Sequence, residues 1–137
     1  MAPLPRMEKA TLLLFRRRGP DEILVTKKPP RGEASLPYAL CEPGEAPVDA
    51  ARRVAPELAH GPVANVLKLA LSNEFKVKNG PSAGDWRESF VAVEMAADAR
   101  AARGAEWRVH YDAKAALAHV KARDAITELR AVARLLP

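Results

Sequence analysis

The sequence predicts a mixed α/β sandwich made by a single domain. Strand-like runs occupy most of the first two thirds of the chain, one amphipathic helix interrupts them, and two helices close the C-terminus. Too few helices separate the strands for a wound βαβ sheet. The length of 137 residues suits one compact domain and leaves no room for two. We therefore expect an N-terminal tail over residues 1–9 and one domain over residues 10–137.

A β-hairpin is predicted at the start of the domain. Residues 11–18 and 22–28 are rich in residue types that favour strands, and Gly19-Pro20-Asp21 between them is strong turn chemistry. A loop is expected at residues 29–32. Residues 35–45 then form an irregular stretch with a strand-like middle.

The next segment, residues 47–59, has the periodicity of an amphipathic helix. Pro47 suits the first helical position, because its missing N–H costs nothing there. Pro56 removes a hydrogen bond and crowds the preceding turn, so we expect a kink or a distorted last turn. One face is apolar, with Val48, Ala51, Ala55 and Leu58, and a second stripe holds Asp49, Arg53 and Glu57.

Three further strands and two helices complete the predicted domain. Residues 65–78 form one long bent strand or two short ones, residues 86–95 form a strand with alternating faces, and residues 106–111 form a short strand. Asp112 is expected to cap the first helix. The apolar positions of the two helices are Ala113, Ala116, Leu117 and Val120, then Ile126, Leu129, Val132 and Leu136.

Charge and cysteine content restrict the class of protein. A net charge of +5 and a pI of 9.7 favour a polyanionic partner such as RNA, although a solvated basic face explains them equally well. Cys41 is the only cysteine, which excludes an internal disulfide and indicates a reducing compartment. No apolar run approaches a membrane span of roughly 20 residues. With no signal-peptide pattern, we expect an intracellular protein of the cytoplasm or mitochondrial matrix.

One segment has a recognisable pattern. Residues 34–61 read ASLPYALCEPGEAPVDAARRVAPELAHG. They resemble the Nudix box, a loop–helix–loop that runs Gly, five residues, Glu, seven residues, Arg-Glu, an apolar residue, any residue, Glu-Glu, any residue, Gly. Glu45, Arg53 and Glu57 match at the family's spacing. The resemblance covers most of residues 10–136, and it implies a Nudix-type α/β/α sandwich with a mixed sheet, a box helix and C-terminal helices.

Several positions depart from the family's pattern. Tyr38 and Ala39 occupy the glycine positions of the loop, and His60 stands at the position of the terminal glycine. Val54 replaces the glutamate that follows the arginine, and Leu58 replaces the second glutamate of the pair. The box is therefore degenerate at the positions that hold its acidic groups.

The departures have a chemical consequence. The resemblance implies hydrolysis of a pyrophosphate linkage, in which Mg²⁺ ions neutralise the substrate and activate water. Mg²⁺ prefers oxygen ligands, and carboxylates supply the charge. Helix positions 54, 57 and 58 lie together on one side of the helix. Since only Glu57 is acidic among these three, we expect affinity for a metal cluster to fall by orders of magnitude.

The remaining box residues form the candidate site. The resemblance assigns Glu57, Arg53 and Glu45 to a remnant catalytic set, with Glu57 as a weak metal ligand and Ala39 contributing its backbone carbonyl. In the family, the pair equivalent to Glu45 and Arg53 braces the loop against the helix. A simpler interpretation of Glu57 is a solvated carboxylate paired with Arg53 one turn earlier.

Our first hypothesis is a catalytically impaired Nudix-fold protein that serves as a structural, RNA-contacting or nucleotide-contacting subunit of a larger assembly, without a cofactor. A Nudix-like protein in the large subunit of the mitochondrial ribosome is a precedent at family level. The affinity that such a subunit gains from phosphate contacts would fall steeply as the salt concentration rises. The candidate contacts are the basic residues Arg16, Arg18, Lys27, Lys28, Arg31, Lys76 and Lys78, although Arg16, Arg17 and Arg18 alternate faces and a solvated strand edge also explains them.

The second hypothesis is a divergent Nudix hydrolase that uses Mg²⁺ or Mn²⁺. Glu57 would act with Glu42 or Glu45, and Glu88 or Glu94 would add a ligand or general base. A third interpretation is that the box match is accidental. The other chemically notable side chains have simpler interpretations. His60, His110 and His119 lack the spacing of metal ligands, so we expect them to be solvent-exposed or packed. Trp86 and Trp107 are expected to pack in the core or at a sheet edge, and Cys41 is expected to be a small buried hydrophobe.

Overall fold

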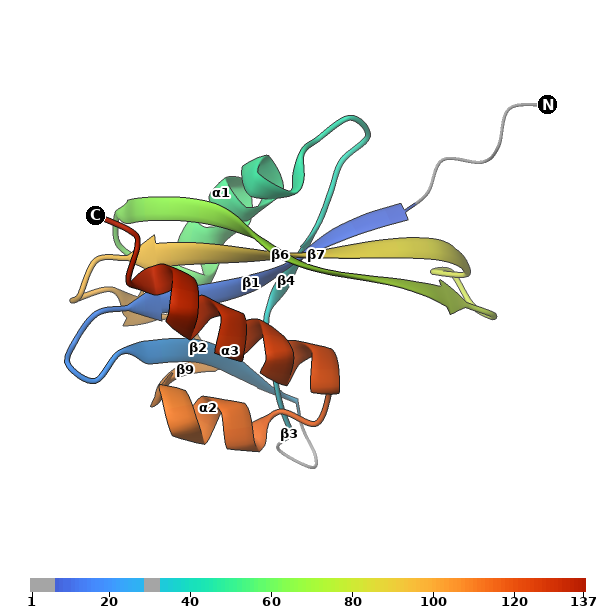
Figure 1. Cartoon of the computed structure of the whole chain (residues 1–137). Coiled ribbons are helices and arrows are strands. Elements are labelled where there is room, and N and C mark those ends of the chain that lie inside the picture. The colour runs from blue at the N-terminus through green and yellow to red at the C-terminus, as the bar shows by residue number, and fades with distance from the viewer. Residues whose placement is uncertain (1–6, 29–32) are drawn as a thin grey trace.

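A mixed β-sheet lies between helices on both of its faces (Figure 1). The computed structural model describes residues 7–28 and 33–137. Helix α1 covers one face of the sheet, and α2 and α3 cover part of the other. The predicted mixed α/β sandwich is confirmed.

The strands are β1 (Met7–Arg16), β2 (Glu22–Lys28), β3 (Glu33–Ser35), β4 (Tyr38–Leu40), β5 (Ala59–His60), β6 (Val63–Val77), β7 (Gly84–Met95), β8 (Arg100–Ala101) and β9 (Ala105–Val109). The helices are α1 (Pro47–Leu58), α2 (His110–Ala116) and α3 (Val120–Ala133). The large sheet has the order β3-β2-β1-β7-β6, with β4 joined to β1 and β9 joined to β2. β1 and β7 run parallel, whereas the other named strand pairs are antiparallel.

The predicted hairpin of β1 and β2 is confirmed, but its first strand is longer than expected. Phe15 pairs with Ile23 across the hairpin. β1 begins at Met7, so the last three residues of the predicted tail, Met7 to Lys9, pair with β7 from Trp86 to Glu88. Glu8 and Lys9 show no apolar alternation, and the long partner strand supplies the pairing that their own sequence does not predict.

Two hydrophobic clusters hold the layers together, one on each face of the sheet. Alternation along β1 sends Leu13 and Phe15 to the face of α2 and α3, and Leu12 and Leu14 to the face of α1. The predicted apolar face of α1 is confirmed, with a core of small side chains that let the helix approach the sheet: Ala50, Ala51 and Ala55 are fully buried, and Val48 and Leu58 pack at the margin.

The helix ends differ from the prediction in three places. α1 continues through Pro56 and ends at Leu58, one residue before the predicted end. α2 begins at His110, so Asp112 lies inside its first turn and is not the cap; Val109 takes that position without a side-chain hydrogen bond. Val120 begins α3 and is exposed, because the chain leaves α2 before that residue could continue its apolar face.

The longest strand, β6, is continuous but irregular. Its register against β7 shifts between Lys68 and Ser72. The carboxylate of Glu128 in α3 accepts hydrogen bonds from the backbone N–H of Ala70 at 2.6 Å and of Leu71 at 3.0 Å at this irregularity. Beyond it, β6 and β7 project past the end of α3 (Figure 1). Among the described residues, none of the helices is long and apolar enough to cross a membrane.

Candidate functional site

The loop–helix segment predicted from residues 34–61 is present as β4, a loop and α1. Arg53 of α1 ties the loop to the helix. Its Nε lies 3.1 Å from Oε2 of Glu45, and its Nη2 lies 2.9 Å from both Oε1 of Glu45 and the carbonyl oxygen of Leu40. The N–H of Glu42 donates to the same carboxylate at 3.0 Å. These hydrogen bonds, that of Arg53 first, lower the pKa of Glu45.

The two helix positions that depart from the acidic box pattern are partly turned towards the sheet. Val54 and Leu58 are half-buried and pack against the cluster between α1 and the sheet. Glu57, between them in sequence, is exposed. Val54 and Leu58 therefore extend the apolar core, and Glu57 is the solvated carboxylate on this turn of the helix.

The backbone carbonyl of Ala39 takes part in the sheet. Ala39 is buried in β4 opposite Ala10 of β1. Hydrogen bonds from Leu12 N–H to Pro37 O at 2.8 Å and from Cys41 N–H to Glu8 O at 3.0 Å lie on either side. Because hydrogen-bonded pairs alternate along an antiparallel ladder, Ala10 and Ala39 form such a pair. The carbonyl of Ala39 is thus directed at β1.

The carboxylates considered as metal ligands do not converge. Glu45 is bound to Arg53, whereas Glu94 pairs with Arg17 at 3.0 Å and accepts from Asn65 at 2.7 Å. Within residues 7–28 and 33–137, no three His, Cys, Asp or Glu side chains are grouped so as to hold a metal ion. The oxygen donors that Mg²⁺ needs are dispersed, so the described residues do not fit a catalytic magnesium centre.

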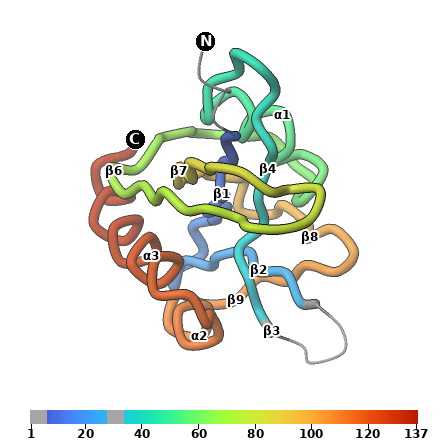
Figure 2. The backbone as a smooth tube through the Cα atoms, turned by 90° about the vertical axis from the view of Figure 1, so that its right-hand side faces the viewer, coloured from blue at the N-terminus to red at the C-terminus, as the bar shows by residue number. Residues whose placement is uncertain are grey.

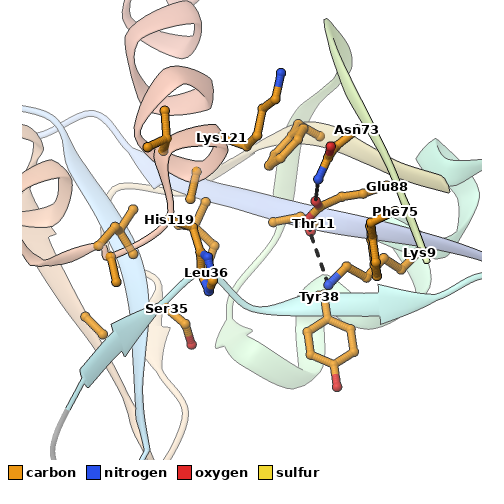
Figure 3. Close-up of a pocket in the computed structure, with 16 residues that line it drawn as sticks. Lys9, Thr11, Ser35, Leu36, Tyr38, Asn73, Phe75, Glu88, His119 and Lys121 are labelled. Atoms are coloured by element: carbon orange, nitrogen blue, oxygen red, sulfur yellow. Dashed lines mark hydrogen bonds and ion pairs between the residues drawn. The ribbon is translucent and has the colours of Figure 1, made fainter. Parts of the chain in front are cut away.

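Glu88, the remaining candidate, lies on the opposite face of the sheet in a cavity of about 490 Å³ (Figure 3). The carboxylate accepts a short hydrogen bond from the hydroxyl of Thr11 and one from Nδ2 of Asn73 at 3.3 Å. Nζ of Lys9 lies 3.8 Å away. Only 14% of the Glu88 side chain is exposed, so this charge is held on the cavity floor by three polar neighbours from two adjacent strands.

The cavity walls combine apolar and polar side chains. They are formed by β4, the central strands and the connection between α2 and α3. Leu36, Phe90 and Leu117 line the interior, and Tyr38 and Lys121 are exposed at the margin. Convergent polar groups beside apolar walls are a usual feature of a small-molecule site.

Local sequence patterns did not reveal this cavity. Thr11, Asn73 and Glu88 are far apart in the chain, and only the pairing of β1 with β7 and of β7 with β6 places them side by side. Glu88 was identified from its strand, but as a possible partner of the box. The sequence did contain one indication of the cavity side. Glu88 and Phe90 are two residues apart on one strand, so both side chains lie on the face of the sheet away from α1.

The basic residues proposed as phosphate contacts lie in different environments. Arg16 is buried: its Nε and Nη2 lie 2.9 Å and 2.8 Å from Glu22, its Nη1 donates to Ala99 O at 2.7 Å, and the guanidinium lies over the ring of Trp107. This placement contradicts a phosphate contact for Arg16, since buried partners already bind the whole guanidinium. Arg17 is similarly engaged, with Glu94 and with Ala133 O at 2.9 Å.

The other basic candidates are exposed. Arg18, Lys27 and Lys76 each lie within 4.0 Å of a carboxylate, whereas Lys78 is exposed without an ion pair in the described part of the chain. Arg31 and the side chain of Lys28 lie outside the described residues.

Two of the simpler interpretations are tested by the structure. Trp107 packs under Arg16 and donates to Ala99 O at 3.1 Å, which confirms a packing role. Cys41 is half-buried beside the α1 cluster, and burial raises the pKa of its thiol, so it is not poised as a nucleophile.

No protein-family model matches the chain, and no curated protein matches its sequence. Solved structures do match it. The Ap4A hydrolase of C. elegans superposes with a TM-score of 0.69 at 16% identity, over 94% of this chain and 99% of the hydrolase. RenU, a Nudix hydrolase of M. smegmatis, superposes with a TM-score of 0.65 at 22% identity, over 96% of this chain and 88% of RenU. The chain has the Nudix fold.

A further Nudix structure contains a ligand. The Nudix domain of Shewanella oneidensis NrtR, solved with ADP ribose, superposes with a TM-score of 0.68 at 13% identity, over 96% of this chain and 90% of that one. At such identities the likeness establishes the fold and not the activity. The Nudix fold expected from residues 34–61 is confirmed, and the interpretation of that match as accidental is wrong.

Proposed function

We propose that this Nudix-fold protein binds a nucleotide-like ligand in the cavity above Glu88 and does not hydrolyse pyrophosphate linkages efficiently. The observation that supports the proposal most directly is the separation of the two features. The last turn of the box helix carries one exposed carboxylate, that of Glu57, while a formed cavity with a polar floor lies on the other face of the sheet.

Charge density is the reason to expect weak or no hydrolysis. A diphosphate linkage carries several negative charges, which Mg²⁺ or Mn²⁺ must neutralise before water attacks. The carboxylates that would gather those ions are replaced by half-buried Val54 and Leu58, and Glu45 is engaged by Arg53. We therefore propose no cofactor.

The size and lining of the cavity favour a small ligand with a planar head group. Ligand sites usually measure about 300–1,000 Å³, and this cavity lies within that range. The carboxylate of Glu88 can accept hydrogen bonds from an amino group, and the ammonium of Lys121 at the margin can meet a phosphate. ADP ribose, the ligand of the NrtR Nudix domain, combines an adenine with a diphosphate and is the natural first probe.

Calorimetric titration with ADP ribose and ADP tests the binding. We expect saturable binding that Glu88→Gln weakens roughly tenfold, since this change removes a charged acceptor and keeps its shape. Glu57→Gln is the matched control, because it removes an exposed carboxylate on the other face and should leave the affinity unchanged. The proposal is wrong if neither compound binds, or if Glu88→Gln and Glu57→Gln act alike.

Release of phosphate-containing products from Ap4A, ADP ribose and other nucleoside diphosphate derivatives tests the hydrolysis. With Mg²⁺ or Mn²⁺ we expect no turnover above the rate without protein. Turnover that disappears in Glu57→Gln would establish the alternative, a divergent Nudix hydrolase.

A further inference from the structure

We infer that the sheet face beside the cavity is a base-stacking surface for single-stranded nucleic acid. This surface, called the aromatic ledge below, consists of Tyr38, Lys9, Phe75 and Trp86. The inference rests on the proposed function in one respect: the cavity would take one base, and the ledge would take its neighbours along the strand.

Strand pairing places the ledge residues on one face of the sheet. Lys9 and Glu88 are paired between β1 and β7, and Trp86 is paired with Phe75 between β7 and β6. Trp86 lies two residues before Glu88 on β7, so both side chains point to the cavity side. The ledge is therefore continuous with the cavity floor, and Tyr38, Lys9 and Phe75 line both (Figure 3).

The ledge lies on the part of the sheet that the helices do not cover. In the described part of the chain, the N-terminal end of α3 lies over the middle of the sheet, and β6 and β7 project beyond it (Figure 1). The view along this projection shows the hairpin of β6 and β7 in front, with α3 to one side and α1 above (Figure 2). Tyr38 is 50% exposed, and Phe75 and Trp86 are partly exposed.

The aromatic rings are held in a fixed arrangement. Phe75 and Trp86 stack with their planes 5° apart and their centroids separated by 6.1 Å. Nε1 of Trp86 donates to Ser82 O at 2.8 Å, which fixes the indole. Nζ of Lys9 lies 4.9 Å from the centre of the Tyr38 ring and 5.5 Å from that of Phe75. Rings that are already ordered lose little entropy when a ligand stacks on them.

Ordered aromatic rings and exposed cations together favour nucleic acid over other partners. Every base has a π-face, so stacking on aromatic side chains tolerates any sequence, and lysines track the phosphates. Lys121 at the cavity margin and Lys78 just beyond β6 are exposed, and neither is ion-paired with a described residue. The net charge of +5 attracts a polyanion. A duplex would keep its bases stacked on one another, so the partner must be single-stranded.

Fluorescence anisotropy with labelled oligonucleotides tests the ledge. The ligands are a short RNA, a DNA of the same sequence, an abasic strand of the same length and a duplex. We expect the two single strands to bind with similar affinity and the abasic strand and the duplex to bind much more weakly. Equal binding of the abasic strand would overturn the inference, because phosphate attraction alone would then explain the signal.

Variants of Trp86 separate stacking from charge. Trp86→Leu keeps an apolar side chain but removes the π-face, and we expect roughly tenfold weaker binding of the single strands. Trp86→Phe should restore most of the affinity. The matched control is Tyr111→Leu, since Tyr111 is 69% exposed on α2, away from the ledge, and its loss should change nothing. Equal affinities for the Leu variant and the unchanged protein would overturn the inference.

A second measurement does not depend on the folding of a Trp86 variant. In Trp107→Phe, Trp86 is the only tryptophan. We expect a single strand to quench its fluorescence and the abasic strand to leave it unchanged; a strand that binds without quenching would overturn the inference.

Failure of the ledge and failure of the proposed function give different results. If ADP ribose binds and no single strand does, the ledge inference is wrong and the proposed function stands. If single strands bind through Trp86 and no nucleotide enters the cavity, the ledge stands and the proposed function is wrong.

Discussion

Arg53 and Glu45 form a two-pronged ion pair, with Nε of Arg53 3.1 Å from Oε2 and Nη2 2.9 Å from Oε1 of the carboxylate. The same guanidinium reaches the carbonyl oxygen of Leu40, and Glu45 also accepts the N–H of Glu42. One ion pair thus fixes the path of the loop between β4 and α1. The loop is braced in this way although Val54 and Leu58 on the same helix are apolar.

Breaking this brace is expected to loosen the loop in a pH-dependent way. The pKa of Glu45 is lowered from its ordinary value of 4.5, so the folded state holds the proton less tightly than the unfolded chain. The stabilisation is therefore complete above pH 4.5 and is lost as the pH falls through the lowered folded pKa. The difference in melting temperature between the unchanged protein and Arg53→Ala should shrink over that range. A difference that stays constant in acid would contradict the role of the Glu45 charge.

His110 is expected to make the C-terminal helices sensitive to acid. Both ring nitrogens are buried, and within the described residues neither makes a well-formed hydrogen bond. Burial lowers the pKa of His110 and the charges of Arg130 and Lys114 act in the same direction, whereas the backbone of Ile126 and the charge of Asp21 oppose them. Because the folded state resists protonation, stability is complete above the ordinary pKa of 6.5 and falls as the pH drops below it.

Urea unfolding at a series of pH values checks this expectation. His110→Phe should flatten the dependence between neutral and mildly acidic pH, since it removes the titrating group and fills the same space. His60→Gln is the control, because His60 is exposed and its loss should preserve the slope. An unchanged slope in His110→Phe would assign the acid sensitivity to another group.

The link between α3 and the irregular part of β6 is expected to contribute strongly to stability. The carboxylate of Glu128 accepts the N–H groups of both Ala70 and Leu71, which the register shift leaves without partners on β7. Hydrogen bonds to a charged group contribute about 1.5–3 kcal/mol, so Glu128→Ala should lower the free energy of unfolding by about 2 kcal/mol. Hydrogen exchange should show faster exchange at Ala70 and Leu71 while the amides of β1 stay protected. Equal protection of these two amides in the variant would contradict the assignment.

Local patterns in the sequence predicted the elements better than the contacts between them. The turn at Gly19-Pro20-Asp21 defined the hairpin, and the alanine-rich face of α1 has the predicted period of a helix against a core. The start of β1 at Met7 could not be predicted, because Glu8 and Lys9 are held in the sheet by pairing with a strand about eighty residues later.

In the candidate site, too, local patterns predicted the residues of one segment but not the contacts between distant strands. The box positions, including Glu45 and Arg53, followed from spacing along one segment. The cavity did not, since Thr11 and Glu88 meet only through the parallel register of β1 and β7. Burial also could not be predicted for Arg16. Its charge suits a phosphate contact, but in the fold its guanidinium is enclosed by Glu22 and Trp107.

The proposal that α1 has too few carboxylates to hold a metal ion predicts that added acidic groups would create such a site. In the double variant Val54→Glu, Leu58→Glu, two carboxylates join Glu57 on adjacent positions of one helix side, which gives a hard divalent ion three oxygen donors. Both positions are half-buried, so the metal-free variant should lose about 1–3 kcal/mol of stability. Calorimetry should detect Mn²⁺ binding to the variant and not to the unchanged protein. Mn²⁺ should also raise the melting temperature of the variant alone, because the ion binds only its folded state. The variant Val54→Gln, Leu58→Gln separates charge from polarity, and it should lose stability without gaining affinity for the ion. Firm Mn²⁺ binding by the unchanged protein would contradict this account, since the dispersed carboxylates would then suffice.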